Sequence, residues 1–190
     1  MSFDASVFIH EKALVEECEI GPRTRVWAFA CITKGAKIGA DCNVCSYAFL
    51  ERGVVVGNKV TIKNGVQIFE RVTVEDEVFL GPNMVFTNDM NPRVGFKKKI
   101  EEYFPTLVKK GASIGANATI VCGATIGEHA FIGAGTLVLH NVPAHAMVVG
   151  NPSRQIGWMC TCGTKLGASF ECKCGRKYRL VSAEHGLAQV

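Results

Sequence analysis

Residues 26–50 read VWAFACITKGAKIGADCNVCSYAFL, and every sixth position in this stretch is a large aliphatic residue. The same spacing of apolar residues runs without a break from Phe8 to Phe86, and it resumes from Val108 to Val138. A smaller apolar residue usually follows four positions later. Because six and four are both even, strand alternation keeps both positions on one face, whereas a 3.6-residue helical turn does not. Each six-residue unit therefore predicts a short strand and a corner.

This periodicity is typical of an all-β parallel β-helix, in which each coil stacks on the one before it. Fourteen hexads in the first run and six in the second, at three per coil, predict about seven coils. The interior of such a column is filled by its own side chains, so we expect any site on the outside, at a loop or between subunits. We predict a β-helix domain over residues 1–150 and a C-terminal extension over residues 151–190.

One long excursion interrupts the repeat after Phe86. Val108 takes the place that residue 92 would have in an unbroken repeat, so sixteen residues are inserted, within a loop over residues 87–107. A loop of this length in a compact solenoid is usually functional. The insertion also places Asn117 over Asn83 on the neighbouring coil.

Charge is distributed unevenly along the chain, although the net value is only +4. Residues 87–110 contain six Lys and Arg against three acids, and residues 154–180 contain six against one. These two basic stretches suit a polyphosphorylated small ligand. Their positive electrostatic field is too weak for a nucleic-acid-binding protein. Six charged residues among the first twenty argue against a signal peptide or membrane span, so we expect a cytoplasmic protein.

Outward aromatic residues predict self-association. Residues 18 apart should stack on adjacent coils, so Phe29 and Tyr47 form one rib on the outside of the column. An apolar rib on a column of this kind suggests a covered face, and a closed ring of subunits is the simplest cover.

The C-terminal extension contains two Cys-x-Cys-Gly turns, formed by Cys160 with Cys162 and by Cys172 with Cys174. They resemble a pair of zinc knuckles, but the usual spacing has two residues between the cysteines. Two interpretations stay open, a structural zinc and four free thiols on a small hairpin. A catalytic zinc is not expected, because four thiolates would leave no open coordination position.

Several motifs resemble those of the left-handed β-helix acyltransferases: GATIG at 123–127, IGAG at 132–135 and VGNP at 149–152. The segment FLGPNMVFTNDMNPR at 79–93, with Pro-Thr at 105–106, resembles a narrower group. This group is the nucleotide-sugar N-acetyltransferases of lipopolysaccharide O-antigen synthesis, in particular those that acetylate the 3-amino group of UDP-2-acetamido-3-amino-2,3-dideoxyglucuronate. The resemblance covers about residues 8–157. It implies a left-handed coil, a homotrimer, and acetyl-CoA in the groove between neighbouring subunits.

Many acetyltransferases of this fold use a histidine as general base, but none of the five histidines fits the root of the loop. We expect surface or capping roles for His10, His129, His140, His145 and His185. A base is not required, because an amine on a sugar ring should resemble an α-amino group, with a pKa of about 7.7–8. A useful fraction is then neutral at pH 7, and the departing thiolate can take the excess proton.

The resemblance and the stacking together assign roles to individual residues. Asn83 is expected to orient the amine or the tetrahedral oxygen, and the alternative is an asparagine that only forms a corner. Asn88 and Asp89 would contact the sugar, and Arg93 would pair with the glucuronate carboxylate. Glu70, expected to stack under Asn88, and Asp89 are the alternative bases. The residues expected at acetyl-CoA are Lys109, Lys110 and Arg154 for the phosphates, and Gly111, Ala112, Ala118 and Gly135 for the pantetheine groove.

Three other functions compete with acetyl transfer to the aminoglucuronate. A carbonic anhydrase on the same fold needs three imidazoles around zinc, and no histidine trio of suitable phase exists. A non-catalytic solenoid that binds partners would not need the sixteen-residue insertion. Acetyl transfer to another dTDP-linked or UDP-linked amino sugar stays open, because Arg93 is the only argument for a carboxylate on the acceptor.

Overall fold

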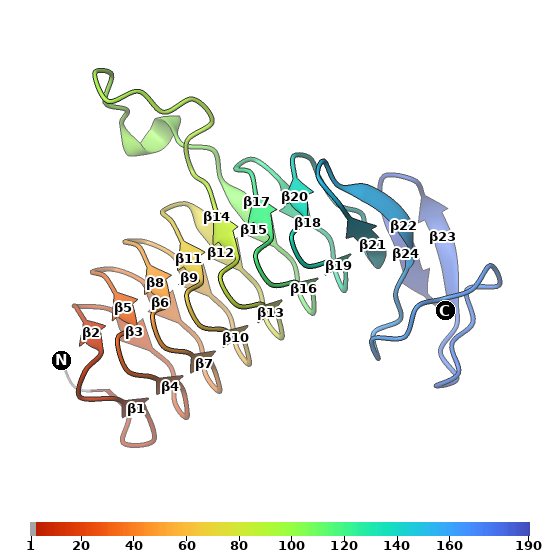
Figure 1. Cartoon of the computed structure of the whole chain (residues 1–190). Coiled ribbons are helices and arrows are strands. Elements are labelled where there is room, and N and C mark those ends of the chain that lie inside the picture. Colours follow the sequence, from red (N-terminus) through yellow and green to blue (C-terminus); the bar gives the residue numbers. More distant parts are fainter. Residues whose placement is uncertain (1–2) are drawn as a thin grey trace.

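The computed structural model describes residues 3–190 as an all-β column of stacked coils with one projecting loop (Figure 1). Three sheets of parallel strands run along the column. The first sheet contains β1 (Phe8–Ile9), β4 (Arg25–Val26), β7 (Asn43–Val44), β10 (Thr61–Ile62), β13 (Phe79–Leu80), β16 (Ser113–Ile114), β19 (Phe131–Ile132) and β21 (Ala146–Val149), followed by β22 (Arg154–Trp158), which pairs antiparallel with β21. The second sheet contains β2 (Leu14–Val15), β5 (Cys31–Ile32), β8 (Phe49–Leu50), β11 (Gln67–Ile68), β14 (Val85–Phe86), β17 (Thr119–Ile120) and β20 (Leu137–Val138).

The third sheet contains β3 (Glu19–Ile20), β6 (Lys37–Ile38), β9 (Val55–Val56), β12 (Val72–Val74), β15 (Thr106–Val108) and β18 (Thr125–Ile126). Strands β1 to β20 make seven coils, and β21 begins an eighth. The predicted parallel β-helix is confirmed, and the hand of its coil remains a prediction. Across residues 3–190, no helix is both long and apolar enough to span a bilayer.

Strand register confirms the size of the insertion. Thr61 pairs with Phe79, 18 residues later, whereas Phe79 pairs with Ser113, 34 residues later, and the difference is sixteen. The excursion ends earlier than predicted. Thr106 and Leu107 already belong to β15, where they pair with β12, so the loop occupies residues 87–105 rather than 87–107.

The core is one continuous column of inward side chains from Ile20 to Val148. The prediction that Phe8 and Leu14 belong to it is wrong, because these side chains are 39% and 59% exposed. Ile9 and Val15 pack against the core in their place. Since side chains alternate between faces, starting the first coil one residue out of phase turns its aromatic and leucine residues outward. Phe8 then packs against Trp27 with ring centroids 5.5 Å apart.

Left-handed backbone recurs every sixth residue and makes three corners. We call the corner between the first and second sheets the first corner, that between the second and third sheets the second corner, and that between the third and first sheets the third corner. Positive φ angles at the third corner occur at Arg23, Asp41, Lys59, Glu77, Gly111, His129 and His145. At the first corner, Phe29 stacks on Tyr47 with centroids 5.1 Å apart, which confirms the predicted rib.

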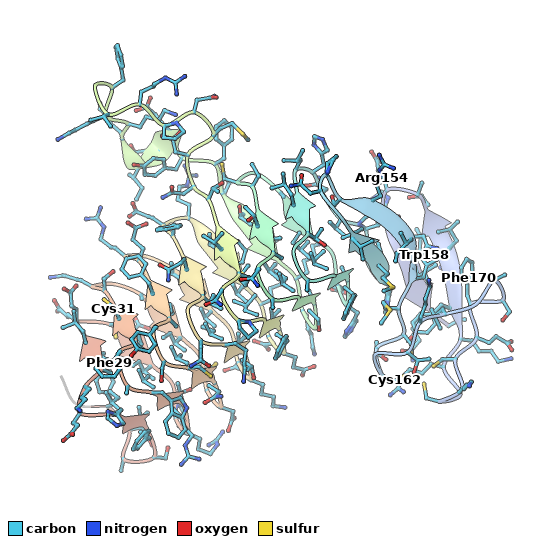
Figure 2. The ribbon with its side chains drawn as sticks, in the orientation of Figure 1. Phe29, Cys31, Arg154, Trp158, Cys162 and Phe170 are labelled. Carbon is cyan, nitrogen blue, oxygen red and sulfur yellow. The ribbon has the colours of Figure 1, made fainter. Side chains whose placement is uncertain are left out.

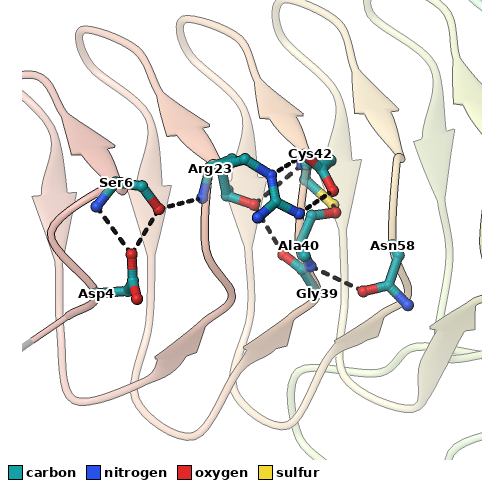
Figure 3. Close-up of polar contacts among 9 residues, drawn as sticks. Asp4, Ser6, Arg23, Gly39, Ala40, Cys42 and Asn58 are labelled. Carbon is teal, nitrogen blue, oxygen red and sulfur yellow. Dashed lines mark hydrogen bonds and ion pairs between the residues drawn. The ribbon is translucent and has the colours of Figure 1, made fainter.

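Polar side chains tie neighbouring coils together at the third corner (Figure 3). The Arg23 guanidinium donates to both carboxylate oxygens of Asp41, at 2.6 and 2.7 Å. The Ala40 backbone N–H donates to Oδ1 of Asn58 on the next coil at 2.9 Å. Gly39 lies at the same corner, and its backbone approaches that of Gly57 on the next coil so closely that no side chain fits between them.

The C-terminal segment forms a small unit at the end of the column (Figure 1). It contains two short turns, bridged at Met159 with Lys165 and at Glu171 with Lys177, and the hairpin of β23 (Tyr178–Ser182) and β24 (Gly186–Gln189). Its buried cluster consists of Cys160, Leu166, Cys172, Tyr178 and Leu187. The predicted cysteine-containing hairpin is therefore confirmed.

We predict that Gly39→Ala destabilises the column by about 1–3 kcal/mol, as expected when a packed interior is overfilled. The added Cβ would lie 2.5 Å from the Gly57 carbonyl oxygen, a backbone atom that cannot move aside. Gly53→Asn is the control, because a Cβ there meets nothing within 4 Å and asparagine tolerates its positive φ. Urea unfolding of both variants measures the effect, and equal midpoints for the two would contradict it.

Candidate active site

Asn83 lies at the first corner, one coil below Asn117 and two below Gly135. The backbone N–H of Asn117 donates to the Pro82 carbonyl at 2.9 Å, which confirms the predicted stacking on Asn83. Asn83 has a φ of 57°, a left-handed conformation that asparagine tolerates better than most residues. Its side chain is exposed and makes no hydrogen bond within residues 3–190. The residue therefore forms a corner and also presents a free amide to the outside.

The excursion begins at the far end of β14 from Asn83, so the two are separated by one strand. The loop closes at its base where the Phe104 backbone N–H donates to the Asn88 carbonyl at 3.2 Å. Thr87 contributes a second link, since its Oγ1 accepts a hydrogen bond of 3.0 Å from the Cys122 N–H. Asn88 is thereby fixed at the second corner, next to the column.

Asp89 is occupied by contacts within the loop. Its carboxylate pairs with the Lys98 ammonium and also accepts from the Asn91 backbone N–H at 2.9 Å. The hydrogen bond from Lys98 is the main reason that the pKa of Asp89 is lowered. A carboxylate with a lowered pKa is a weak proton acceptor at neutral pH. The geometry thus argues against Asp89 as the base and favours a role in holding the loop.

Glu70 lies under the base of the excursion, because Gln67 of the same coil pairs with Val85. It is buried, and its carboxylate accepts from Nε of Arg52 at 3.2 Å. Its backbone N–H donates to a carboxylate oxygen of Glu51 at 2.8 Å. Glu70 is therefore a residue of the second corner, and its negative charge is already paired with Arg52.

Arg71 anchors the loop, a role that was not predicted from the sequence. From the second corner, with a φ of 69°, its Nη1 donates to the carbonyls of Ile100, Glu101 and Tyr103 at 3.3, 2.9 and 2.7 Å. The first two belong to the 3-10 turn η1 (Ile100–Glu102). One signal was available, since residue 89 of the loop falls 18 positions after Arg71 and should stack on it.

The outer part of the excursion leaves apolar side chains uncovered. Val94 is fully exposed and Phe96 is 79% exposed, and the loop projects away from the column (Figure 1). Arg93 donates only to the carbonyl of its neighbour Pro92, at 2.9 Å, among the contacts of residues 3–190. Within residues 3–190, no carboxylate-binding pocket is built around its guanidinium.

The residues expected at acetyl-CoA divide between two corners. Gly135 shares the first corner with Asn83, and Arg154 begins β22 directly after Ser153, whose N–H donates to the Leu137 carbonyl at 2.9 Å. Lys109, Lys110, Gly111 and Ala112 lie instead at or before the third corner. The side chains of Ala112 and Ala118 point into the core.

The Lys110 ammonium lies 3.6 Å from Oε1 of Glu77, beside a shallow hollow of 340 Å³ that includes Val55 and Thr73. A single subunit therefore does not bring its first-corner and third-corner groups together.

The histidines lie away from Asn83, as expected, but His145 is not a surface residue. It is 5% exposed, its ring lies tilted against that of His129 with centroids 5.1 Å apart, and its Nδ1 lies 2.8 Å from the Met159 carbonyl. Burial lowers the pKa of both histidines. Both belong to the third corner, where Gly111 leaves room for the His129 ring. Neither is placed to take a proton at the first corner.

The four cysteines of the tail do come together. Their sulfur atoms all lie within 4.8 Å of one another, with 3.5 Å from Cys160 to Cys174 and from Cys162 to Cys172. This set of soft donors fits a four-thiolate metal site. The metal itself remains a prediction.

Comparison with known proteins bears on what this site does. The family "Bacterial transferase hexapeptide (six repeats)" matches residues 105–140, and "Hexapeptide repeat of succinyl-transferase" matches residues 32–70. The dTDP-3-amino-3,6-dideoxy-alpha-D-galactopyranose 3-N-acetyltransferase of Aneurinibacillus thermoaerophilus is 47% identical over 181 residues, which cover 94% of this chain and 93% of that protein. The chain belongs to the hexapeptide-repeat nucleotide-sugar N-acetyltransferases.

Two further comparisons give lower identities. Serine acetyltransferase 2 of Arabidopsis thaliana is 38% identical over 104 residues, 55% of this chain and 26% of that protein. Among solved structures, a mutant of perosamine N-acetyltransferase from Caulobacter crescentus, in complex with CoA and GDP-perosamine, aligns with a TM-score of 0.53. The alignment covers 80% of this chain and 56% of that one at 20% identity, so it supports the fold alone.

We predict that Arg71→Ala loosens the excursion of the acetyltransferase without unfolding the column. Three loop carbonyls lose their donor. Amide hydrogen exchange should accelerate across residues 96–104, and kcat/KM should fall by about tenfold or more, because loop positions orient reacting groups. Arg23→Ala is the matched control, another left-handed corner arginine, but one that pairs with Asp41 far from the loop. Unchanged exchange in the Arg71 variant would contradict the anchor.

Proposed function

We propose that this acetyltransferase transfers the acetyl group of acetyl-CoA to the 3-amino group of a dTDP-linked 3-amino-3,6-dideoxyhexose. The observation that carries the proposal is the 47% identity, over nearly the whole length of both chains, to an enzyme named for that acceptor class. The alternative acceptor, UDP-2-acetamido-3-amino-2,3-dideoxyglucuronate of O-antigen synthesis, rests on Arg93. That side chain is exposed, and among the described residues its guanidinium hydrogen-bonds only to the Pro92 carbonyl, which gives the carboxylate less support.

The proposed chemistry requires no general base from the protein. The neutral amine attacks the thioester carbon, the carbon–sulfur bond breaks, and the thiolate of CoA leaves and accepts the proton that the amine loses. The protein supplies position and stabilises the tetrahedral oxygen. Asn83 suits both tasks, because its amide is exposed and makes no hydrogen bond to the residues that the structure describes. Asn88, fixed at the base of the loop, would contact the sugar.

We infer that the site is completed by a neighbouring subunit of a homotrimer, with acetyl-CoA in the groove between two columns. The residues expected at the cofactor lie on two different corners of one column, so a groove that uses both needs one corner from each of two subunits. Uncovered apolar residues on the loop and the stacked rib of Phe29 and Tyr47 support the same arrangement.

A metal at the four cysteines would have a structural role in this scheme. Four thiolates fill a tetrahedral zinc and leave no position for water or substrate. The cysteines also belong to the tail after the last coil, whereas Asn83 and Asn88 lie in the middle of the column.

An acceptor panel tests the substrate. We expect thiol release from acetyl-CoA with dTDP-3-amino-3,6-dideoxyhexoses, and a much lower kcat/KM with the UDP-linked 3-aminoglucuronate. The opposite preference would restore the carboxylate acceptor and the assigned role of Arg93. If none of the acceptors in the panel causes thiol release, acetyl transfer to an amino sugar would be contradicted.

Substitution of Asn83 separates its two roles. Glycine accepts left-handed backbone, so Asn83→Gly keeps the corner and removes only the amide. We predict a fall in kcat of about 100-fold, the size found when one oxyanion donor is lost, with little change in Tm. The matched control is Asn117→Gly, which makes the same change one coil higher on the same corner. Wild-type kcat in the Asn83 variant would leave only the corner-forming role.

A further inference from the structure

The tail contains an internal repeat of twelve residues. Residues 158–166 read WMCTCGTKL and residues 170–178 read FECKCGRKY, with an aromatic residue, two cysteines, glycine and lysine at matching positions. The backbone repeats as well. The Gly163 N–H donates to the Cys160 carbonyl and the Gly175 N–H to the Cys172 carbonyl, each at 2.9 Å, and both glycines have positive φ, 84° and 89°. The two segments are therefore the same turn built twice.

We propose that Cys160, Cys162, Cys172 and Cys174 bind one Zn²⁺ as four thiolates, and that this ion holds the tail against the open end of the β-helix. This inference is independent of the acceptor sugar. Each copy of the turn supplies two of the four sulfurs, and the aromatic residues that open the copies, Trp158 and Phe170, meet edge to face at 6.5 Å (Figure 2).

The sulfur positions fit a tetrahedral ion. With Zn–S bonds of about 2.3 Å, the sulfurs of a tetrahedron lie roughly 3.8 Å apart. Here two pairs of sulfurs from opposite turns lie 3.5 Å apart, and all four are within 4.8 Å. The missing residue in each Cys-x-Cys pair does not prevent convergence, because each sulfur of one turn lies 3.5 Å from a sulfur of the other turn.

Polar groups around the sulfurs suit thiolates. The Arg176 guanidinium donates to Sγ of Cys174 at 3.2 Å, the Tyr178 hydroxyl lies 3.1 Å from Sγ of Cys160, and the Thr164 hydroxyl lies 3.3 Å from Sγ of Cys162. Such outer contacts orient metal ligands and tune them. Zinc with four thiolates carries a formal charge of −2, and residues 165–179 offer five cations against one acid: Lys165, Lys173, Arg176, Lys177 and Arg179 against Glu171.

The tail is also too small to hold its shape by burial alone. Its own cluster has five buried residues, two of which are cysteines. Units below about 40 residues usually need a metal or disulfides to fold. All nine cysteines are free thiols in the structure, so no disulfide supplies the link.

The tail also makes contacts with the end of the column. We call the metal site together with these contacts the clasp, because they hold the tail against the last coil. The Met159 N–H donates to the His145 carbonyl at 2.7 Å, and the Met159 carbonyl lies 2.8 Å from Nδ1 of the same histidine. The ring of Tyr178 meets that of His145 edge to face at 4.9 Å. Trp158 packs against both the column core and the tail cluster. Loss of the ion therefore frees the surface that covers the last coil.

Metal analysis of the full chain tests the site. We expect one zinc per chain by mass spectrometry of the purified protein, and, after exchange with Co²⁺, the intense visible absorption of a tetrahedral cobalt–thiolate centre. Cys162→Ser and Cys174→Ser, which change the two exposed cysteines, should lose the ion. Cys31→Ser, a thiol on the column, should keep it. Wild-type protein without bound metal, or with these cysteines joined as disulfides in non-reducing peptide mapping, would overturn the site.

Hydrogen exchange tests the clasp. When a strong chelator has removed the metal, exchange should accelerate across residues 142–189, and strands β4 to β14 should stay protected. Restored protection after zinc is added back would support the proposal. Unchanged exchange in residues 142–148 after proven metal loss would overturn the clasp while leaving the site intact. Acetyl transfer is a separate assay, so its failure would not be confused with failure of the metal site.

Discussion

The column from the second coil to the seventh depends on a fixed spacing of 18 residues per coil, interrupted only by the excursion. Each coil must place its large and small apolar side chains over those of the coil below, and its left-handed corners over the corners below. Parallel strands of only two residues have little stability of their own. Stacking makes them stable, because each strand hydrogen-bonds to the coils on both sides while its inward residue is removed from water. The close approach of Gly39 and Gly57 shows how little space the register leaves.

The same constraint decides where chemistry takes place. Since the interior is solid, recognition uses the corners, the sheet faces and the single excursion. The excursion belongs to the second corner, whereas Asn83 faces outward at the first. We propose that these elements form one site through the short strand β14 between them and through the association of subunits.

Much of the fold could be predicted from the sequence, because its periodicity states the register directly. The sixteen inserted residues and the stacking of Asn117 on Asn83 followed by counting. Counting failed at the first coil, where Phe8 and Ile9 are both apolar and either fits a two-residue alternation. The site was harder to predict. The corner partners of Asn83 were found, but the anchoring role of Arg71 depends on carbonyls about 30 residues away, and the burial of His145 depends on a tail that carries no hexads.

The strand register across the excursion also bears on how the acceptor specificity of such an enzyme can change. Below and above the loop, the strands resume their pairing as if the sixteen residues were absent. The column therefore needs only two things of the inserted segment: a start after β14 and a return at Thr106. Within those limits, a change in the length or the side chains of the segment would leave the register of the column intact. Under the proposal that the excursion contacts the acceptor, a new acceptor specificity needs no repacking of the core.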